Sequence, residues 1–112
     1  MPHTLIYWAP EVINLQKYGS KSDMWALGVT LYQIVTGEHP FSTNDELTFR
    51  NELLNSRVDY SRLIGHNRLK IIIENLLKVD PYSRWDANTV LIYAQHDFII
   101  DIQRMYRGFK ER

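Results

Sequence analysis

The sequence predicts an all-α fold. Apolar residues recur at the three- and four-residue spacing of a helix over most of the chain, and no alternating run of convincing length indicates a strand. Hydrophobic residues make up 45% and aromatic residues 12% of the 112 residues, which is enough to build a packed core. Because disordered chains lack such apolar content, we expect a single folded domain over residues 1–112.

A strongly apolar helix is expected in the first half of the chain. Ser22 or Asp23 can cap its start, and Gly37 stands where such a helix usually ends. The helix is apolar on all sides, so we expect it at the centre of the domain, with Trp25, Leu27 and Leu31 in the core. Its periodic apolar residues are Trp25, Leu27, Leu31, Ile34 and Val35.

Four further helices are expected. One spans about residues 44–54, with Leu47, Leu53 and Leu54 facing inward, and another spans residues 66–77. A fourth begins after the candidate N-cap Asp86 and runs through Ala94. The fifth follows a separate apolar stripe made of Phe98, Ile102, Met105 and Phe109. Residues 55–65 are expected to form an irregular connection, and residues 1–20 show no helical periodicity.

Composition excludes several classes of protein. There is no cysteine, which excludes a disulfide scaffold, thiolate zinc sites and thiol catalysis. Thirteen basic residues balance thirteen acidic ones, so a general nucleic-acid-binding protein is not expected. No apolar run is long enough to cross a membrane and no signal peptide is visible, so we expect an intracellular protein, cytoplasmic or nuclear.

The residues alone indicate no catalytic or metal site. The four histidines are not spaced as metal ligands, and no H-E-x-x-H pattern occurs. The five glycines are too widely separated to form a phosphate-binding loop. No serine stands in a G-x-S-x-G turn, so a nucleophile of that type is not expected either.

Three blocks of the sequence resemble eukaryotic protein kinases. Residues 4–11 (TLIYWAPE) contain the A-P-E signature that closes the kinase activation segment. Residues 22–41 are similar to the central helix F and the loop that leaves it, and residues 76–85 are similar to the H–I junction with its arginine. The blocks follow the order of the family at similar spacing and cover about residues 3–98. Thr4 and the later T-G-x-x-P-F pattern resemble serine/threonine kinases more than tyrosine kinases.

The resemblance implies the lower part of the C-terminal large lobe, from the A-P-E motif onward. Residues 1–20 would form the end of the activation segment, with an irregular path. Residues 22–98 would form helices resembling F, G, H and I. Residues 99–112 would form a C-terminal helical extension, whose apolar stripe packs on the lobe. Alternatively, the basic face of this extension contacts a partner.

The resemblance also assigns roles to single residues. Glu11 would pair with Arg84 in a buried bridge, and two unrelated surface charges are the alternative. Asp23 is similar to the aspartate that anchors the catalytic loop, and a simple helix cap is the alternative.

The substrate loop implied by the resemblance contains Thr4, Tyr7 and Trp8. Thr4 would line the substrate side of the active site, and His3 replaces the glycine usual before it. Trp8 would help to form the pocket for the substrate residue that follows the phosphoacceptor. Alternatively, Trp8 only packs on the lobe.

Several elements of kinase catalysis stand before the A-P-E motif in the family. They are the Gly-rich loop, the ATP-binding lysine, the helix-C glutamate, the catalytic-loop aspartate and asparagine, and the D-F-G aspartate that holds magnesium. Only ten residues precede Glu11. We therefore expect no catalytic residue, no cofactor and no phosphate transfer in this chain alone, with ATP and Mg²⁺ bound by an intact parent kinase.

Three hypotheses remain open from the sequence. The chain is part of a complete serine/threonine kinase, and its partners are a protein substrate and the missing N-terminal kinase portion. Alternatively, it is a naturally truncated kinase mimic, a pseudokinase that binds a kinase or its partner without catalysis. The third hypothesis is a self-associating interaction domain, because a lobe cut below its catalytic loop exposes apolar surface, and a homodimer is therefore expected under either of the other two hypotheses as well. Nucleic acid and membrane partners are not expected.

Overall fold

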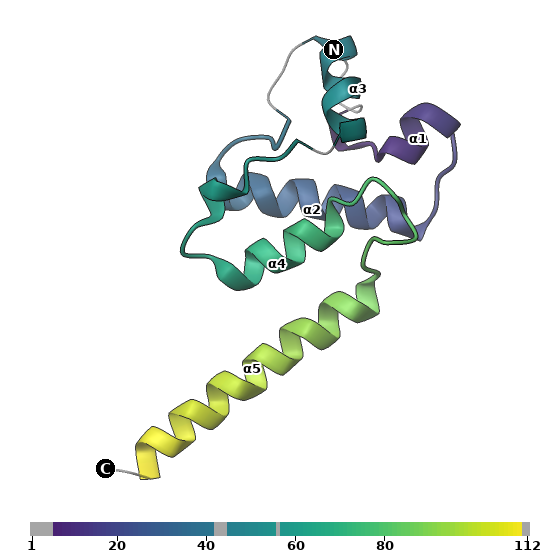
Figure 1. Ribbon diagram of the computed structural model, residues 1–112. Helices are drawn as coiled ribbons and strands as arrows, with labels where there is room; N and C mark the ends of the chain where they lie inside the picture. Colours follow the sequence, from purple (N-terminus) through teal and green to yellow (C-terminus); the bar gives the residue numbers. More distant parts are fainter. Residues whose placement is uncertain (1–5, 42–44, 56, 111–112) are drawn as a thin grey trace.

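The computed structural model describes residues 6–41, 45–55 and 57–110, and within these ranges every long regular element is an α-helix (Figure 1). The all-α prediction is therefore confirmed. The elements are α1 (Pro10–Leu15), α2 (Ser20–Thr36), α3 (Glu46–Asn55), the short 3₁₀ helix η2 (Tyr60–Leu63), α4 (Asn67–Leu76) and α5 (Ala87–Lys110). No helix of the described residues is both long and apolar enough to cross a membrane.

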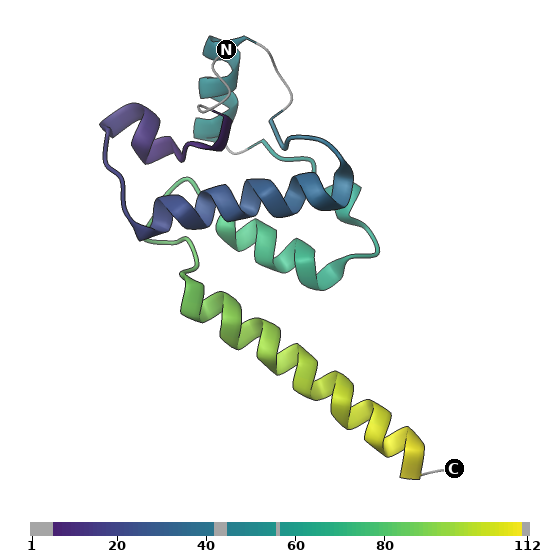
Figure 2. The same cartoon turned by 180° about the vertical axis from the view of Figure 1, so that it is seen from behind.

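Helix α2 lies at the centre of the molecule. In both views α4 runs beside it, α1 and α3 lie on its other side, and α5 leads away from the body (Figures 1 and 2). Helix α2 ends as predicted at Gly37, whose φ of 77° is the left-handed conformation that glycine adopts without strain. Its start differs from the prediction, because the N-cap is Gly19 rather than Ser22 or Asp23.

The core forms on one face of α2. Trp25, Val29 and Tyr32 are spaced by four and three residues, and all three are buried in the main apolar cluster. Leu31 is partly buried and packs against both core clusters. The prediction for Leu27 is wrong, because it lies about 200° around the helix from Trp25 and is exposed.

Helices α3 and α4 bury narrower faces than α2. In α3 the buried residues are Phe49 and Leu53, one turn apart, and the sequence reasoning missed Phe49. Leu47 is 77% exposed and Leu54 is also exposed, contrary to the prediction, because neither lies on the Phe49–Leu53 face. Helix α4 lies within the predicted range of 66–77, and its buried residues are Ile72, Ile73 and Leu76.

Two short helices were not predicted. Helix α1 occupies part of the segment that shows no periodicity, and it starts with Pro10, whose fixed φ suits the first helical position. In the predicted irregular connection, η2 follows Asp59, whose carboxylate accepts a hydrogen bond from the Ser61 backbone N–H at 3.1 Å. Six- and four-residue helices are too short to show an apolar repeat, so periodicity does not detect them.

Helix α5 is continuous where two helices were predicted. Asp86 caps its start as expected, accepting the Thr89 N–H at 2.8 Å, and no proline or glycine interrupts the chain before Gly108. The helix makes the molecule elongated, with a radius of gyration of 16.6 Å against about 13 Å for a compact chain of this length. The side chains of the predicted stripe lie outside the described part: Phe98, Ile102, Met105 and Phe109.

We predict that Gly28→Ala destabilises the protein. A Cβ atom at Gly28 would lie 2.8 Å from Leu76 Cβ and 3.0 Å from Leu77 Cδ2, so α2 and α4 would have to separate. Overpacking of this kind exceeds the gain in helix propensity, and we expect a net loss of about 1 kcal/mol or more in unfolding free energy. Urea unfolding measures this loss. Thr30→Ala, on the exposed side of α2, is the control, and equal stability of both variants would contradict the prediction.

Candidate functional site

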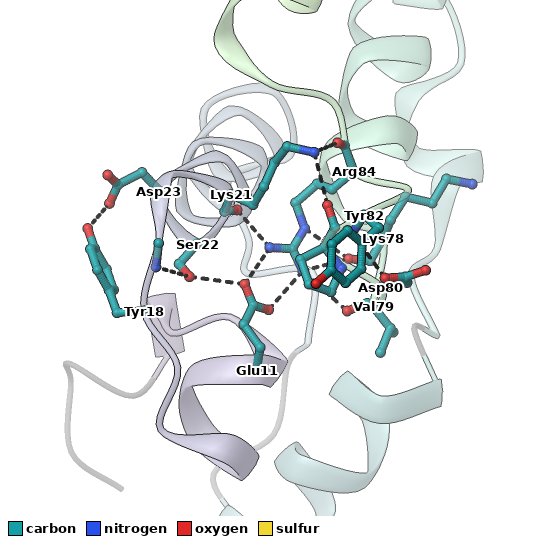
Figure 3. A network of polar contacts seen from close by, with 12 residues as sticks. Glu11, Tyr18, Lys21, Ser22, Asp23, Lys78, Val79, Asp80, Tyr82 and Arg84 are labelled. Atoms are coloured by element: carbon teal, nitrogen blue, oxygen red, sulfur yellow. Dashed lines mark hydrogen bonds and ion pairs between the residues drawn. The ribbon is translucent and has the colours of Figure 1, made fainter.

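Glu11 and Arg84 form a bidentate ion pair between the start of α1 and the loop before α5 (Figure 3). Arg84 Nη1 lies 2.8 Å from Glu11 Oε2, and Nη2 lies 3.0 Å from Oε1. The two residues are only 9% and 2% exposed. The structure thus brings together two charges that stand 73 positions apart in the sequence.

Arg84 also binds backbone carbonyl groups on both sides of the pair. Nη1 donates to Lys21 O at 2.7 Å, and Nε and Nη2 donate to Lys78 O at 2.9 and 2.8 Å. Nη2 also approaches Val79 O at 3.3 Å. Each of the five guanidinium N–H groups therefore has an acceptor, which is the condition for burying this cation.

Two neighbouring residues that the sequence reasoning did not assign to the bridge complete it. Ser22 Oγ donates to Glu11 Oε2 at 3.0 Å and accepts from the Gly19 N–H at 3.2 Å. Lys21 Nζ donates to the carbonyl oxygens of Pro81 and Arg84, at 3.0 and 2.5 Å. The only sequence signal for them was their position at the start of the predicted helix.

Opposing effects act on the ionisation of Glu11. Burial favours the neutral acid, but hydrogen bonds from Arg84, from the backbone and from Ser22, with the charge of Arg84, outweigh it and lower the pKa of Glu11. An unfolded glutamate has a pKa of about 4.3. The bridge therefore contributes stability above that pH, and this contribution is lost as the pH falls through the lower pKa of the folded state.

A second group of predicted residues borders a pocket of about 440 Å³. The pocket is lined by Tyr7 and Trp8 before α1 and by Asp23 and Ala26 on α2. Tyr7 and Trp8 are exposed, and the Tyr7 hydroxyl donates to Gln33 Oε1 at 2.9 Å. Trp8 therefore does not belong to the buried core. Thr4 and His3, also predicted near this surface, lie outside the described residues.

Asp23 points to the surface rather than to the backbone of its own helix. Its carboxylate accepts a hydrogen bond from the hydroxyl of Tyr18, which raises the pKa of Tyr18 (Figure 3). The helix-cap interpretation of Asp23 is wrong, because Gly19 occupies the N-cap. Asp23 is therefore left on the wall of the pocket beside Tyr7 and Trp8.

His39 joins the segment of Tyr7 to the loop that follows α2, a contact that the sequence did not predict. Its Nε2 lies 2.6 Å from Ile6 O, and its Nδ1 accepts the Phe41 N–H at 3.0 Å. Nδ1 also lies 3.1 Å from Phe41 O, so it can accept from the Phe41 N–H when the ring is neutral and donate to the Phe41 carbonyl when the ring is protonated. Burial lowers the pKa of His39 and outweighs the opposing hydrogen bonds to Ile6 and Phe41.

The acidic residues and histidines of the described part of the chain are not gathered in one place. Among the described residues, no three histidine, aspartate or glutamate side chains come together in a way that holds a metal ion. The described part of the chain offers a buried polar bridge, a small pocket with exposed aromatic side chains, and a larger pocket beside Tyr82.

Comparison with known proteins identifies the family. The chain matches the protein kinase domain over residues 1–99. Since the match covers most of the 112 residues, this chain belongs to the protein kinase family.

The similar proteins include serine/threonine kinases. The chain is 34% identical over 108 residues to developmentally-regulated protein kinase 1 of Dictyostelium discoideum, covering 92% of the chain and 14% of that protein. It is 41% identical over 103 residues to serine/threonine-protein kinase ATG1b of Arabidopsis thaliana, covering 88% and 14%. It is 34% identical over 99 residues to serine/threonine-protein kinase 33 of Bos taurus, covering 79% and 19%. The chain thus spans less than a fifth of these relatives.

Solved kinase structures share the fold. A structure of the Rad53 kinase domain with SCD2 superposes with a TM-score of 0.69 at 33% identity, covering 81% of this chain and 36% of that one. The twitchin kinase region of C. elegans gives a TM-score of 0.72 at 28% identity, covering 80% and 16%. The predicted resemblance to protein kinases is therefore confirmed.

We predict that Arg84→Met lowers the unfolding free energy by about 3–5 kcal/mol, because it leaves the Glu11 carboxylate buried without its partner. Arg62→Met is the matched control, since Arg62 forms an exposed ion pair with Glu38 and should leave the urea midpoint almost unchanged. If Arg84→Met does not fold, helical circular dichroism at low temperature still separates the two variants. Similar midpoints for both variants would contradict a structural role for the bridge.

The low pKa of His39 predicts a loss of stability on mild acidification. The unfolded chain takes up a proton near pH 6.5, while the folded imidazole resists protonation. The free energy of unfolding therefore falls as the pH drops from 7.5 to 5.5. The difference in this free energy between the natural chain and His39→Gln becomes smaller over the same range. Urea midpoints at both pH values measure this, with the exposed His66→Gln as control. An unchanged difference at pH 5.5 would refute the prediction.

Proposed function

We propose that this chain is the lower part of the C-terminal lobe of a serine/threonine protein kinase, from the A-P-E motif onward. The observation that carries the proposal is the buried Glu11–Arg84 bridge, which joins the A-P-E segment to the loop before α5. Burying two charges carries a large desolvation penalty, and it is offset only when the pair has good geometry and its other donors are hydrogen-bonded. Two unrelated charges do not meet these conditions. The bridge joins the block at residues 4–11 to the block at residues 76–85, and the kinase resemblance implies that these two blocks are linked by this ion pair.

In this proposal the chain supplies a substrate-docking surface and the scaffold beneath it. The docking surface is the pocket bordered by Tyr7, Trp8 and Asp23, where exposed aromatic side chains can hold a peptide beside the phosphoacceptor. The scaffold is α2, whose first turn reaches the bridge and whose C-terminal end meets the loop of His39.

The chemistry belongs to the parent protein in this proposal. The parent transfers a phosphoryl group from ATP, with Mg²⁺, to serine or threonine of a protein substrate. The residues that bind ATP and Mg²⁺ lie in other parts of the parent, and this chain alone is inactive. The similarity to serine/threonine kinases over most of the chain supports the assignment.

A second candidate is a truncated kinase mimic that binds a partner or a second copy without catalysis. Exposed apolar side chains on two helices favour it: Leu27 and Ile34 on α2, and Leu91 and Ile92 on α5. Leu27 and Ile34 are seven residues apart and so lie on one face of α2, which another polypeptide would cover in this candidate. Both candidates share the fold, and they differ in the size and activity of the natural polypeptide.

The natural polypeptide decides between the two candidates. We expect antibody capture from the source, followed by intact mass spectrometry, to yield a species more than twice as heavy as 13.3 kDa. With ATP and Mg²⁺ that species should phosphorylate serine and threonine in a peptide library, whereas the 112-residue chain should not. A natural species of 13.3 kDa without transfer activity would overturn the kinase proposal and favour the mimic.

A further inference from the structure

A larger pocket of about 790 Å³ lies between the end of α1, the loop that enters α2, and the turn at residues 79–82. Its apolar lining includes Leu15, Tyr18, Leu54, Val79 and Tyr82. The volume falls within the range of pockets that bind ligands in proteins, about 300–1,000 Å³. This pocket adjoins the one bordered by Tyr7 and Trp8, and the two linings share Tyr18 and Ser22.

The apolar side chains around this pocket are unusually accessible. Tyr82 is 94% exposed, Tyr18 is 71% exposed, and Leu15 and Leu54 are also exposed. Their exposure means that they add little to the core of this chain. Tyrosine is enriched at protein interfaces, where its ring supplies contact area and its hydroxyl supplies a hydrogen bond.

The wall of the pocket is held in place by the bridge. Lys21 Nζ donates hydrogen bonds to the carbonyl oxygens of Pro81 and Arg84. These hydrogen bonds hold the turn that carries Tyr82 against the start of α2. Asp80 closes the same turn by accepting the Tyr82 N–H at 3.0 Å and the Ser83 hydroxyl at 3.2 Å. A preformed wall lowers the ordering cost of binding.

The pocket lining carries charges of both signs. The charged residues of its lining are Glu11, Lys17, Lys21 and Asp80. Glu11 is neutralised by Arg84, whereas neither lysine forms an ion pair with a carboxylate among the described residues. Lys21 donates to two carbonyl groups and its charge acts on Asp86, so Lys17 is the cation that favours an occupant with negative charge.

We propose that this pocket is a docking site for a segment of a partner protein that inserts a bulky apolar side chain and places an acidic residue beside Lys17. The apolar side chain packs between Leu15, Tyr18 and Tyr82, and the acidic residue pairs with the ammonium group of Lys17. This site is separate from phosphate transfer. The test measures only peptide binding. The docking proposal can therefore fail while the proposed kinase function holds, and the kinase function can fail while the docking proposal holds.

The probe is a ten-residue synthetic peptide with one phenylalanine, one leucine and three glutamates, labelled with a fluorophore and titrated with the full 112-residue chain. One matched peptide has lysine in place of each glutamate, and another has alanine in place of the phenylalanine and the leucine. We expect the glutamate peptide to bind more tightly than either. Lys17→Glu should weaken the binding of the glutamate peptide about fivefold and strengthen the binding of the lysine peptide by a similar factor. Lys70→Glu, with the same charge change on α4, should alter neither.

The apolar contact is tested separately. Tyr82→Ala should weaken the glutamate peptide about tenfold or more, and Leu15→Ser provides a second variant if the first does not fold. Ile64→Ser, which replaces an exposed apolar residue outside this lining, is the control. A photoreactive phenylalanine analogue in the peptide should cross-link to residues 10–22 and 79–82.

Three results would overturn the proposal. The first is binding that Lys17→Glu does not alter, and the second is cross-linking confined to other parts of the chain. The third is self-association that Tyr82→Ala abolishes, because it would assign the pocket to a second copy of this chain.

Discussion

The buried pair of Glu11 and Arg84 is the interaction on which the arrangement of the other elements depends. It joins the start of α1, the start of α2 and the loop at residues 78–84, which are distant in sequence. A buried ion pair contributes little net stability, since desolvation offsets most of the attraction. Its effect is on geometry: a planar guanidinium with five satisfied donors accepts only one placement of the carbonyl groups around it.

Helix α2 connects the bridge at one end of the helix to the loop of His39 at the other. Its first turn contributes Lys21 and Ser22 to the bridge, and its last turn leads to the loop where His39 holds Ile6. Between the two ends, the missing side chain of Gly28 lets α4 approach closely. The small pocket beside Tyr7 and the large pocket beside Tyr82 are thus built on one helix, and Ser22 lines both.

Periodicity predicted α2, α3 and α4 and divided α5 into two helices, and it failed where the cause of structure was local or tertiary. The apolar repeats predicted α2 and α4, and the end of α2 at Gly37 and the start of α5 after Asp86 followed from their capping residues. Helix α1 was missed because six residues hold no full repeat. Leu47 was misplaced because the direction that faces the core depends on where α3 packs, which the helix sequence alone does not determine.

The candidate site was predictable only in part, and for a different reason. No rule of spacing connects Glu11 with Arg84, so their pairing came from the kinase resemblance, and the contributions of Lys21 and His39 to the site were not predicted. The large pocket gave no sequence signal because its lining comes from separate segments. The structure adds a physical connection: an occupant beside Tyr82 would contact a wall that Lys21 ties to Arg84. Because a ligand that binds only the folded state stabilises it, occupancy of this pocket would also stabilise the bridge.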